Sequence, residues 1–328
     1  MMGTSVGILG TGKYVPERRL TNKELEQMVE TNEEWIVSRT GIRERRIAES
    51  SQATSDLAYE ASIRALEAAG ITADQLDLIV VATITPDMFF PSTACILQEK
   101  LGAKKAAAFD LSAACSGFIY GLANAAGFIA TGMYRYVLVV GAECLSRITD
   151  YTDRNTCILF GDGAGAVVLG EVPEGRGFKS FKLGADGAGG DLLRICGGGS
   201  RVPSTEQSVT ERRHFIEMNG RDVFKFAVRV MGSAAEEALA AAGIDKADID
   251  LLIPHQANIR IIQSALERLD LPEEKAAINL DRYGNMSSAS IPVALAEAVE
   301  EGRVSEGDRL VLVGFGGGLT WGASVLVW

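Results

Sequence analysis

Cys115 and His255 are the residues whose positions point most directly to chemistry. Cys115 follows a predicted strand over residues 106–111 and lies within the run Ala113–Phe118, which is predicted to begin a helix rich in small residues. The helix dipole and nearby N–H groups stabilise a thiolate there, so we expect a nucleophilic cysteine with a lowered pKa. His255 directly follows the apolar run Leu251–Pro254, at the strand end where open α/β sheets bind their ligands. A lone histidine there could also be a hydrogen-bonded structural residue.

Two further segments could complete such a site. Asn285 lies in a Gly-Asn pair after the strand-like residues 277–280, although Gly-Asn is also ordinary turn chemistry. The glycines of Gly314–Gly318 follow the last apolar run, where backbone N–H groups can point at an oxyanion without obstruction by side chains. No glycine-rich segment fits a nucleotide-binding signature.

The other cysteines and the second histidine have no comparable setting. His214 stands in a charged neighbourhood and is predicted to lie on the surface. An odd number of cysteines without a C-x-x-C pair argues against a disulfide framework or a zinc cluster, so we expect no metal and a reducing, cytoplasmic environment. The cysteines interpreted as structural are Cys95, Cys144, Cys157 and Cys196.

An internal repeat organises the chain. The segment Ala65–Val80 resembles Ala238–Ile253, and Tyr136–Gly141 resembles Arg309–Gly314 at the same offset. Two matches in one register indicate a duplication, with an N-terminal half over residues 1–173 that carries the cysteine. The C-terminal half, residues 174–328, carries the histidine and the asparagine.

Each half is predicted to alternate helices with buried strands. A helix over residues 54–69 is expected to begin with capping by Thr54-Ser55-Asp56 and to end at Gly70. Its counterpart buries a face from Val223 to Ala238 and stops at Gly243. Continuous apolar runs predict strands covered on both faces, and therefore an α/β architecture of two sheets around a shared middle layer. These runs are residues 78–83, 136–140, 251–253 and 310–313.

One region breaks this pattern. Residues 184–213 are rich in Gly, Ser and Pro and are predicted to form a long surface excursion of flexible turns. The start of the chain, Met1–Ile8, already resembles a strand and lacks the basic segment of a secretory signal.

The charge of the chain limits its partners. The formal net charge is −11, which argues against nucleic acid because phosphate neutralisation requires a basic face. Charged residues also interrupt every apolar run before the roughly 18 residues that a membrane span requires. An acidic protein partner would need a local basic patch.

Motifs over nearly the whole chain resemble those of the β-ketoacyl-acyl carrier protein synthase III family, the initiating condensing enzymes of type II fatty acid synthesis. The resemblance implies the thiolase-like fold, a five-layered αβαβα arrangement of two duplicated halves, in agreement with the repeat. The matching segments are Gly10–Pro16, Trp35–Ile42, Phe90–Ala94, Ala114–Gly117, Phe160–Ala164, His255–Asn258, Gly284-Asn285 and Gly314–Gly322.

The resemblance also implies a mechanism. Cys115 would take an acyl group from an acyl-CoA primer, and His255 and Asn285 would stabilise the enolate formed when malonyl-acyl carrier protein loses CO₂. The carbanion would then attack the acyl group to give a β-ketoacyl-acyl carrier protein. The backbone N–H groups of Cys115 and Gly317 would hold the oxyanion. No cofactor is implied beyond these two substrates.

Binding roles follow by position in the family. Trp35, Arg39 and Arg154 would contact the nucleotide of coenzyme A, and Gly220, Phe224 and Asn258 would line the pantetheine tunnel. A basic patch of Arg221, Lys225 and Arg260 would receive the acidic acyl carrier protein, although such side chains could also be ordinary surface charges. Phe90 would reach across a homodimer interface to close the partner's acyl pocket.

Other functions on the same scaffold are partly excluded by the residues. Thiolases need a second cysteine in the C-terminal glycine loop, and Gly314–Gly318 has none. Elongating condensing enzymes need a second histidine, which His214 is poorly placed to supply. A starter-unit enzyme of polyketide or secondary metabolism remains the enzymatic alternative, and a non-catalytic acyl-carrier or CoA-binding protein is the other. The length and branching of the primer remain open.

Overall fold

The computed structural model describes residues 4–328, so the first three residues of the predicted N-terminal strand lie outside the described residues. Two main sheets are present. The first has the strand order β1-β7-β6-β4-β5 and the second the order β11-β12-β13-β8. Their bounds are β1 Val6–Tyr14, β4 Leu78–Ala82, β5 Ala107–Leu111, β6 Val137–Cys144 and β7 Asp162–Glu171, then β8 Gly177–Ala185, β11 Leu251–Pro254, β12 Arg309–Gly316 and β13 Thr320–Val327.

The two sheets repeat one topology. In the first, β1 and β6 both pair with β7 in antiparallel fashion, while β4 runs parallel to β6 and β5. In the second, β8 and β12 both pair with β13 antiparallel, and β11 runs parallel to β12. The counterpart of β5 is only an isolated parallel bridge between Leu252 and Ala276. The expected strand over residues 277–280 is therefore wrong, because Leu280 already begins the short helix α9, Leu280–Tyr283.

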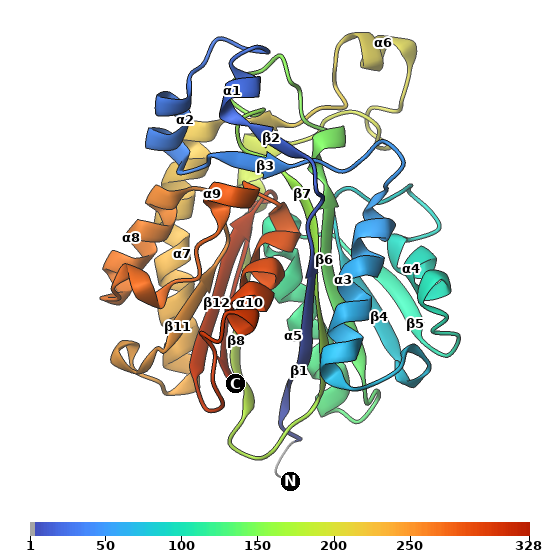
Figure 1. Ribbon diagram of the computed structural model, residues 1–328, viewed down its shortest axis with the longest axis vertical. Helices are drawn as coiled ribbons and strands as arrows, with labels where there is room; N and C mark the ends of the chain where they lie inside the picture. The colour runs from blue at the N-terminus through green and yellow to red at the C-terminus, as the bar shows by residue number, and fades with distance from the viewer. Residues whose placement is uncertain (1–3) are drawn as a thin grey trace.

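Helices and sheets form five layers (Figure 1). Helices α3 and α4 cover the outer face of the first sheet, α7 and α8 cover that of the second, and α5 and α10 lie between the sheets. The predicted architecture is confirmed. These helices are α3 Thr54–Ala69, α4 Thr93–Leu101, α5 Gly117–Ala130, α7 Gly220–Ala242, α8 Ile259–Leu269 and α10 Ser290–Glu300.

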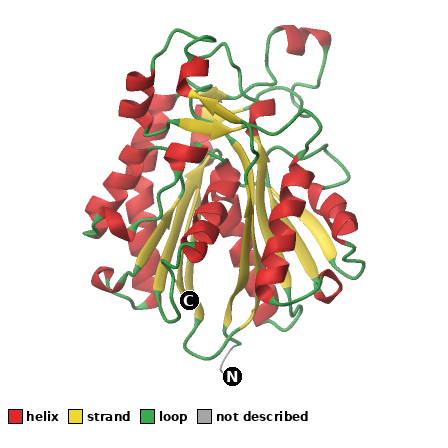
Figure 2. Ribbon diagram, in the orientation of Figure 1, coloured by secondary structure: helices red, strands yellow, loops and turns green. Residues whose placement is uncertain are grey.

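Smaller elements gather at one end of the layers, around α9 (Figure 2). The strands there are β2 Arg19–Thr21 with β3 Glu44–Arg46, and β9 Leu193–Arg194 with β10 Glu217–Met218; the helices are α1 Asn22–Leu25, α2 Glu33–Thr40 and α6 Glu206–Thr210. Short 3₁₀ helices occur at Ala73–Gln75, Ala114–Ser116, Leu145–Arg147, Gly187–Leu192, Lys246–Asp248, Glu273–Lys275 and Ser287–Ala289. Within residues 4–328, no helix combines the length and apolarity needed to cross a bilayer.

The matched helices α3 and α7 begin and end much as the repeat predicts. Both stop at a glycine in the left-handed region, Gly70 with φ +66° and Gly243 with φ +67°. The cap of α3 differs from the expectation. Ala53 is the N-cap, and the carboxylate of Asp56 accepts a hydrogen bond from its backbone N–H (2.8 Å). The hydroxyl of Ser55 instead donates to Asp87 (2.7 Å), which ties the helix to the next loop.

The predicted surface excursion is only partly at the surface. It contains α6 and β9, and β9 pairs with β10 just beyond its end. Leu193 and Ile195 of this segment are half-buried against Leu145, Phe160 and Ile216. Apolar side chains within a Gly-rich segment therefore pack into the body of the protein. This packing brings the segment to the end of the strands where Cys115 lies.

Candidate active site

Cys115 lies in a sharp turn between β5 and α5. The turn is the 3₁₀ segment Ala114–Ser116, so the cysteine precedes the first residue of α5, Gly117. Ala114 has a φ of +47°, a left-handed conformation that costs energy for a residue with a Cβ. The thiol is buried, with 6% of the residue exposed. A strained turn thus presents the sulfur at the carboxyl end of the first sheet.

His255 follows β11 at the corresponding end of the second sheet. Its backbone N–H donates to the carbonyl of Val313 (2.8 Å), and its ring meets Phe315 edge-on. The residue is 1% exposed, yet neither Nδ1 nor Nε2 has a hydrogen-bond partner in the described part of the chain. A structural histidine would be hydrogen-bonded, because burying an unpaired polar group is costly. The ring nitrogens are therefore available to a ligand.

Asn285 is held by two kinds of contact. Its backbone pairs with both neighbours of Phe160, donating to Leu159 O (2.8 Å) and accepting from Gly161 N (3.0 Å). Its Oδ1 accepts a hydrogen bond from the N–H of Ser287 (2.8 Å). Because the amide oxygen is occupied in this way, the –NH₂ group of the carboxamide is the donor left for another partner.

These three side chains line one narrow cavity of about 90 Å³. Segments around residues 115, 255 and 285 therefore converge, as the sequence predicted. The predicted tunnel residues Gly220, Phe224 and Asn258 line the same cavity.

A second cavity, of about 380 Å³, is also lined by Cys115. Its walls are mainly apolar, and several of the wall residues were not predicted from the sequence. Two of them come from the excursion that was interpreted as flexible turns. The unpredicted apolar residues are Ile84, Leu145, Phe160, Leu193, Ile195 and Ile216. An acyl chain bound to the sulfur would find room and apolar surface here.

The C-terminal glycine loop packs directly on the cysteine turn. A Cβ on Gly316 would lie 2.5 Å from the backbone nitrogen of Cys115, closer than real Cβ contacts allow. The next residue, Gly317, lines the larger cavity beside Ala114 and Cys115. The loop that could supply an oxyanion donor is therefore in contact with the Cys115 turn.

Electrostatics at the site contradict the expectation of a ready thiolate. Burial raises the pKa of Cys115 to about 12, against a smaller opposing effect of the Ser287 hydroxyl, and the charge of Glu143 raises it further. Burial also lowers the pKa of His255 to about 3. Burial disfavours the charged form of the sulfur, and its effect on the pKa exceeds the stabilisation of a thiolate expected from the N-terminus of α5. Cys115 is thus a neutral thiol and His255 a neutral imidazole in this site.

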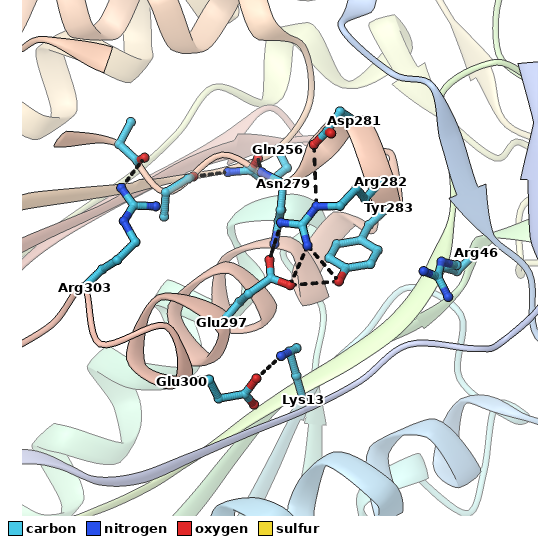
Figure 3. A network of polar contacts seen from close by, with 12 residues as sticks. Lys13, Arg46, Gln256, Asn279, Asp281, Arg282, Tyr283, Glu297, Glu300 and Arg303 are labelled. Atoms are coloured by element: carbon cyan, nitrogen blue, oxygen red, sulfur yellow. Dashed lines mark hydrogen bonds and ion pairs between the residues drawn. The ribbon is translucent and has the colours of Figure 1, made fainter. Parts of the chain in front are cut away.

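A polar network behind the site fixes the segment that leads to Asn285 (Figure 3). At its centre is Glu297 of α10, whose carboxylate accepts hydrogen bonds from Asn279 Nδ2 (2.9 Å), Arg282 Nη2 (2.9 Å) and Tyr283 Oη (2.8 Å). Burial disfavours ionisation of Glu297, but these contacts outweigh it and lower its pKa. The backbone N–H of Asn279 also donates to Gln256, the neighbour of His255 (3.0 Å).

The three residues expected to contact a nucleotide lie together. The guanidinium groups of Arg39 and Arg154 lie 4.9 and 5.6 Å from the ring centre of Trp35. The Nδ2 of Asn258 donates to the carbonyl of Arg39 (2.8 Å), which joins this cluster to the narrow cavity. Trp35 is half-buried, while Arg39 is exposed.

The predicted basic patch flanks the same opening. Arg221 lies in the first turn of α7 beside the lining residue Gly220, and Arg260 lies in the first turn of α8 beside Asn258. Lys225, one turn further along α7, forms an exposed ion pair with Asp222 (3.0 Å). All three cations are exposed.

Phe90 is placed apart from these groups. It is 86% exposed, next to the equally exposed Phe89, and belongs to neither cavity wall. All five cysteines are free, and residues 4–328 contain no cluster of His, Cys, Asp and Glu that could hold a metal ion.

Comparison with known sequences gives a consistent result. Two sequence models match the chain: 3-oxoacyl-[acyl-carrier-protein (ACP)] synthase III over residues 109–187, and the C-terminal part of the same enzyme over residues 239–328. The chain is similar to a beta-ketoacyl-[acyl-carrier-protein] synthase III of Desulfitobacterium hafniense, with 60% identity over 324 residues, 99% of this chain and 98% of the relative. The enzyme of that name from Clostridioides difficile is 55% identical over 327 residues, 100% of this chain and 99% of the relative.

Solved structures agree with the sequences. The 3-oxoacyl-[acyl-carrier-protein] synthase III of Aquifex aeolicus matches with a TM-score of 0.92 and 46% identity, covering 98% of this chain and 100% of that one. The priming β-ketosynthase of a polyketide biosynthetic pathway also matches, with a TM-score of 0.92 and 38% identity over 99% of this chain and 96% of that one.

Proposed function

Because this chain belongs to the β-ketoacyl-[acyl-carrier-protein] synthase III family, it is an acyl-transferring condensing enzyme of fatty acid biosynthesis, and we propose that Cys115, His255 and Asn285 carry out its reaction. The reaction joins an acyl-CoA primer to malonyl-acyl carrier protein, which initiates type II synthesis. The observation that carries the proposed roles is that these three residues line one cavity although they are far apart in the sequence.

In the first half-reaction, the sulfur of Cys115 attacks the carbonyl carbon of the acyl-CoA. The C–S bond to coenzyme A breaks, and the proton of the thiol leaves with coenzyme A as its free thiol. The acyl chain occupies the 380 Å³ cavity beside the sulfur. The N–H groups of Cys115 and Gly317 stabilise the tetrahedral oxyanion, and each donor of this kind is worth roughly 3–4 kcal/mol.

In the second half-reaction, the malonyl thioester loses CO₂ and becomes an enolate. His255 and the Asn285 –NH₂ group donate hydrogen bonds to its oxygen. A histidine with a pKa of about 3 is neutral at physiological pH, so it acts as a hydrogen-bond donor without giving up a proton. The enolate carbon attacks the acyl carbonyl, the bond to Cys115 breaks, and the sulfur takes a proton from solvent to restore the thiol.

The entrance to the cavity suits the two large substrates. Trp35, Arg39 and Arg154 offer a ring and two cations to the nucleotide of coenzyme A, and a phosphopantetheine arm passes between Gly220, Phe224 and Asn258. The exposed cations Arg221, Lys225 and Arg260 attract acidic acyl carrier protein. A local positive surface on a chain of net charge −11 explains how two acidic proteins associate.

The enzyme works as a homodimer in the cytoplasm under this proposal. Phe89 and Phe90 are more than four-fifths exposed, an unfavourable arrangement for two aromatic rings unless another surface covers them. Phe90 of each subunit closes the acyl cavity of the other.

The proposed location in the cytoplasm is consistent with the cysteines. All five are free, as expected under the reducing conditions of the cytoplasm.

A starter-unit enzyme of polyketide biosynthesis is the second candidate. It is favoured by the likeness to the priming β-ketosynthase, which shares the fold at 38% identity. That reaction would use the same three residues with a different carrier protein, so the two candidates differ in carrier preference.

The test is to incubate the protein with a panel of acyl-CoAs and to measure the intact mass of Cys115-containing peptides. We expect one class of primer to add to Cys115 and malonyl-acyl carrier protein to discharge it as a β-ketoacyl product. A Cys115→Ser variant should show neither. Absence of acylation with every primer, in a folded protein, would overturn the proposal; preference for a polyketide carrier would favour the second candidate.

A further inference from the structure

The hydroxyl of Ser287 is a buried polar group without a partner. Ser287 is 1% exposed, and its Oγ has no hydrogen-bond partner among residues 4–328. An unpaired buried hydroxyl costs free energy, so native structures rarely contain one without a purpose. The backbone of Ser287 is also strained, with a φ of +47°.

This hydroxyl belongs to the wall of the cavity that contains the nucleophile. Ser287 and Cys115 both line the 380 Å³ cavity, in which most other wall residues are apolar. The hydroxyl lowers the pKa of Cys115, in opposition to the larger effect of burial. Ser287 is thus a polar side chain beside the sulfur, on the acyl side of the site.

The neighbouring Ser288 provides an internal contrast. It is equally buried, but its hydroxyl contacts Glu143 Oε1 (2.8 Å) and the carbonyl of Ala82 (2.7 Å). Ser288 is therefore part of the internal hydrogen bonding of the fold. The same turn therefore contains one serine whose hydroxyl donates a hydrogen bond within the fold and one whose hydroxyl does not.

Among residues 4–328, the charged and titratable groups near the sulfur are poorly suited to stabilise a thiolate. Glu143 on β6 has a pKa raised by burial, and any charge on it would disfavour a thiolate, while His255 beyond β11 is neutral. Arg194 on β9 lines the cavity but forms ion pairs with Asp191 and Glu217. A thiolate that forms during catalysis therefore needs a neutral donor close to it.

We propose that Ser287 is a further catalytic residue, whose hydroxyl donates a hydrogen bond to the Cys115 sulfur while the sulfur carries negative charge. This role rests on the proposed function. It applies when the thiol proton leaves with coenzyme A, and again when the C–C bond has formed and the thiolate is expelled. Ser287 keeps its own proton throughout, so the stoichiometry of both half-reactions is unchanged. Its backbone N–H separately orients Asn285.

The test compares Ser287→Ala with Ser288→Ala. The rate of Cys115 alkylation by iodoacetamide is measured from pH 6 to pH 10, with alkylation of Cys115 quantified by peptide mass spectrometry. We expect Ser287→Ala to shift the profile to higher pH and to slow alkylation at a fixed pH roughly 10-fold or more, as for a lost hydrogen bond to a charged group. Ser288→Ala should lower thermal stability without shifting the profile to higher pH, because loss of its hydrogen bond disfavours the Glu143 charge that raises the pKa of Cys115. An unshifted profile in Ser287→Ala contradicts the proposal.

Separate assays of the half-reactions provide a second readout. Ser287→Ala should slow release of coenzyme A from acyl-CoA about 10-fold. Decarboxylation of malonyl-acyl carrier protein, measured in a Cys115→Ala background, should change little because the N–H to Asn285 is retained. An equal loss in both half-reactions would indicate a structural role only.

A Ser287→Gly variant is the control for misfolding, since glycine adopts a positive φ without strain. It should reproduce the shifted alkylation profile. Loss of acylation in the unmodified enzyme would contradict the proposed function, whereas an unshifted profile in an active enzyme would contradict only the role of Ser287.

Discussion

The backbone nitrogen of Cys115 lies 2.5 Å from the position that a Cβ on Gly316 would occupy. This contact joins the Cys115 turn of the first half to the glycine loop of the second. It leaves no room for any side chain at residue 316, because the atom that it would meet is backbone and cannot rotate away. The position of the sulfur therefore depends on a glycine from the other half of the duplicated chain.

Gly316→Ala should reduce condensation by about 100-fold or more, since a displacement near 1 Å in an active site can cost that much. The methyl group must push the Cys115 turn away from the loop that contains Gly317. Initial rates of product formation test this expectation. The control is Gly127→Ala in α5, where a Cβ would meet nothing within 4 Å. Near-normal turnover in Gly316→Ala would show that the turn and the loop adjust freely.

Asn285→Ala should slow decarboxylation of malonyl-acyl carrier protein by about 10²–10³-fold, the usual effect of losing one donor to a developing oxyanion. Transfer of an acyl group to Cys115 should persist, because the carboxamide serves only the second half-reaction. Release of CO₂ and intact-mass acylation measure the two steps separately. A variant that loses both steps equally would point to a collapsed site instead.

Glu297→Gln should weaken the network behind Asn285. The replacement amide cannot accept from three donors as a carboxylate does, and we expect a loss of roughly 1–3 kcal/mol in the free energy of unfolding. Decarboxylation should fall more than acylation, because the network fixes the segment before Asn285 and not the Cys115 turn. Urea denaturation and the two half-reaction assays provide the measurements.

The matched control for this change is Glu300→Gln on the same helix. Glu300 pairs with Lys13 and its side chain is 55% exposed, so its loss should cost under about 1 kcal/mol. If both changes lowered the free energy of unfolding equally, the buried Glu297 network would contribute no more to stability than an exposed ion pair.

Much of this architecture could be predicted from the sequence because the duplication repeats local signals. Gly70 and Gly243 end equivalent helices in the same left-handed conformation, and matching apolar runs became equivalent strands. The convergence of Cys115 and His255 followed from the rule that parallel strands present their ligands at the carboxyl ends. Local patterns were sufficient for each of these.

The parts that could not be predicted depend on tertiary packing. The pKa of Cys115 was expected to be low from its place near a helix start, but burial raises it, and burial is a property of the whole site. Leu193 and Ile195 lie in a segment rich in glycine, so no periodicity marked them as cavity walls. Ser287 gave no signal beyond its closeness to Asn285.

Phe90→Ser tests the proposed dimer. The ring is 86% exposed, so its loss should leave the stability of a single chain nearly unchanged while it weakens association and opens the acyl cavity to longer primers. Sedimentation velocity and the acyl-CoA panel are the measurements. Met133→Ser is the control, since Met133 is another exposed apolar side chain (63%) outside this loop. Unchanged association and unchanged primer range in Phe90→Ser would contradict both roles.

The burial of His255 predicts how stability depends on pH. Its pKa in the folded protein is lowered from 6.5 to about 3, so between these values the unfolded chain binds a proton that the folded chain does not. The contribution of His255 to the free energy of unfolding has its full value above pH 6.5. It decreases as the pH is lowered toward 3, by at most about 1.4 kcal/mol per pH unit. A His255→Gln variant has no such proton. The difference in unfolding free energy between the two proteins, measured by urea denaturation from pH 7.5 to pH 5, should therefore change with pH and level off above about pH 7. A constant difference across this range would mean that the folded imidazole titrates normally, and it would then be charged too readily to act as the neutral donor in decarboxylation.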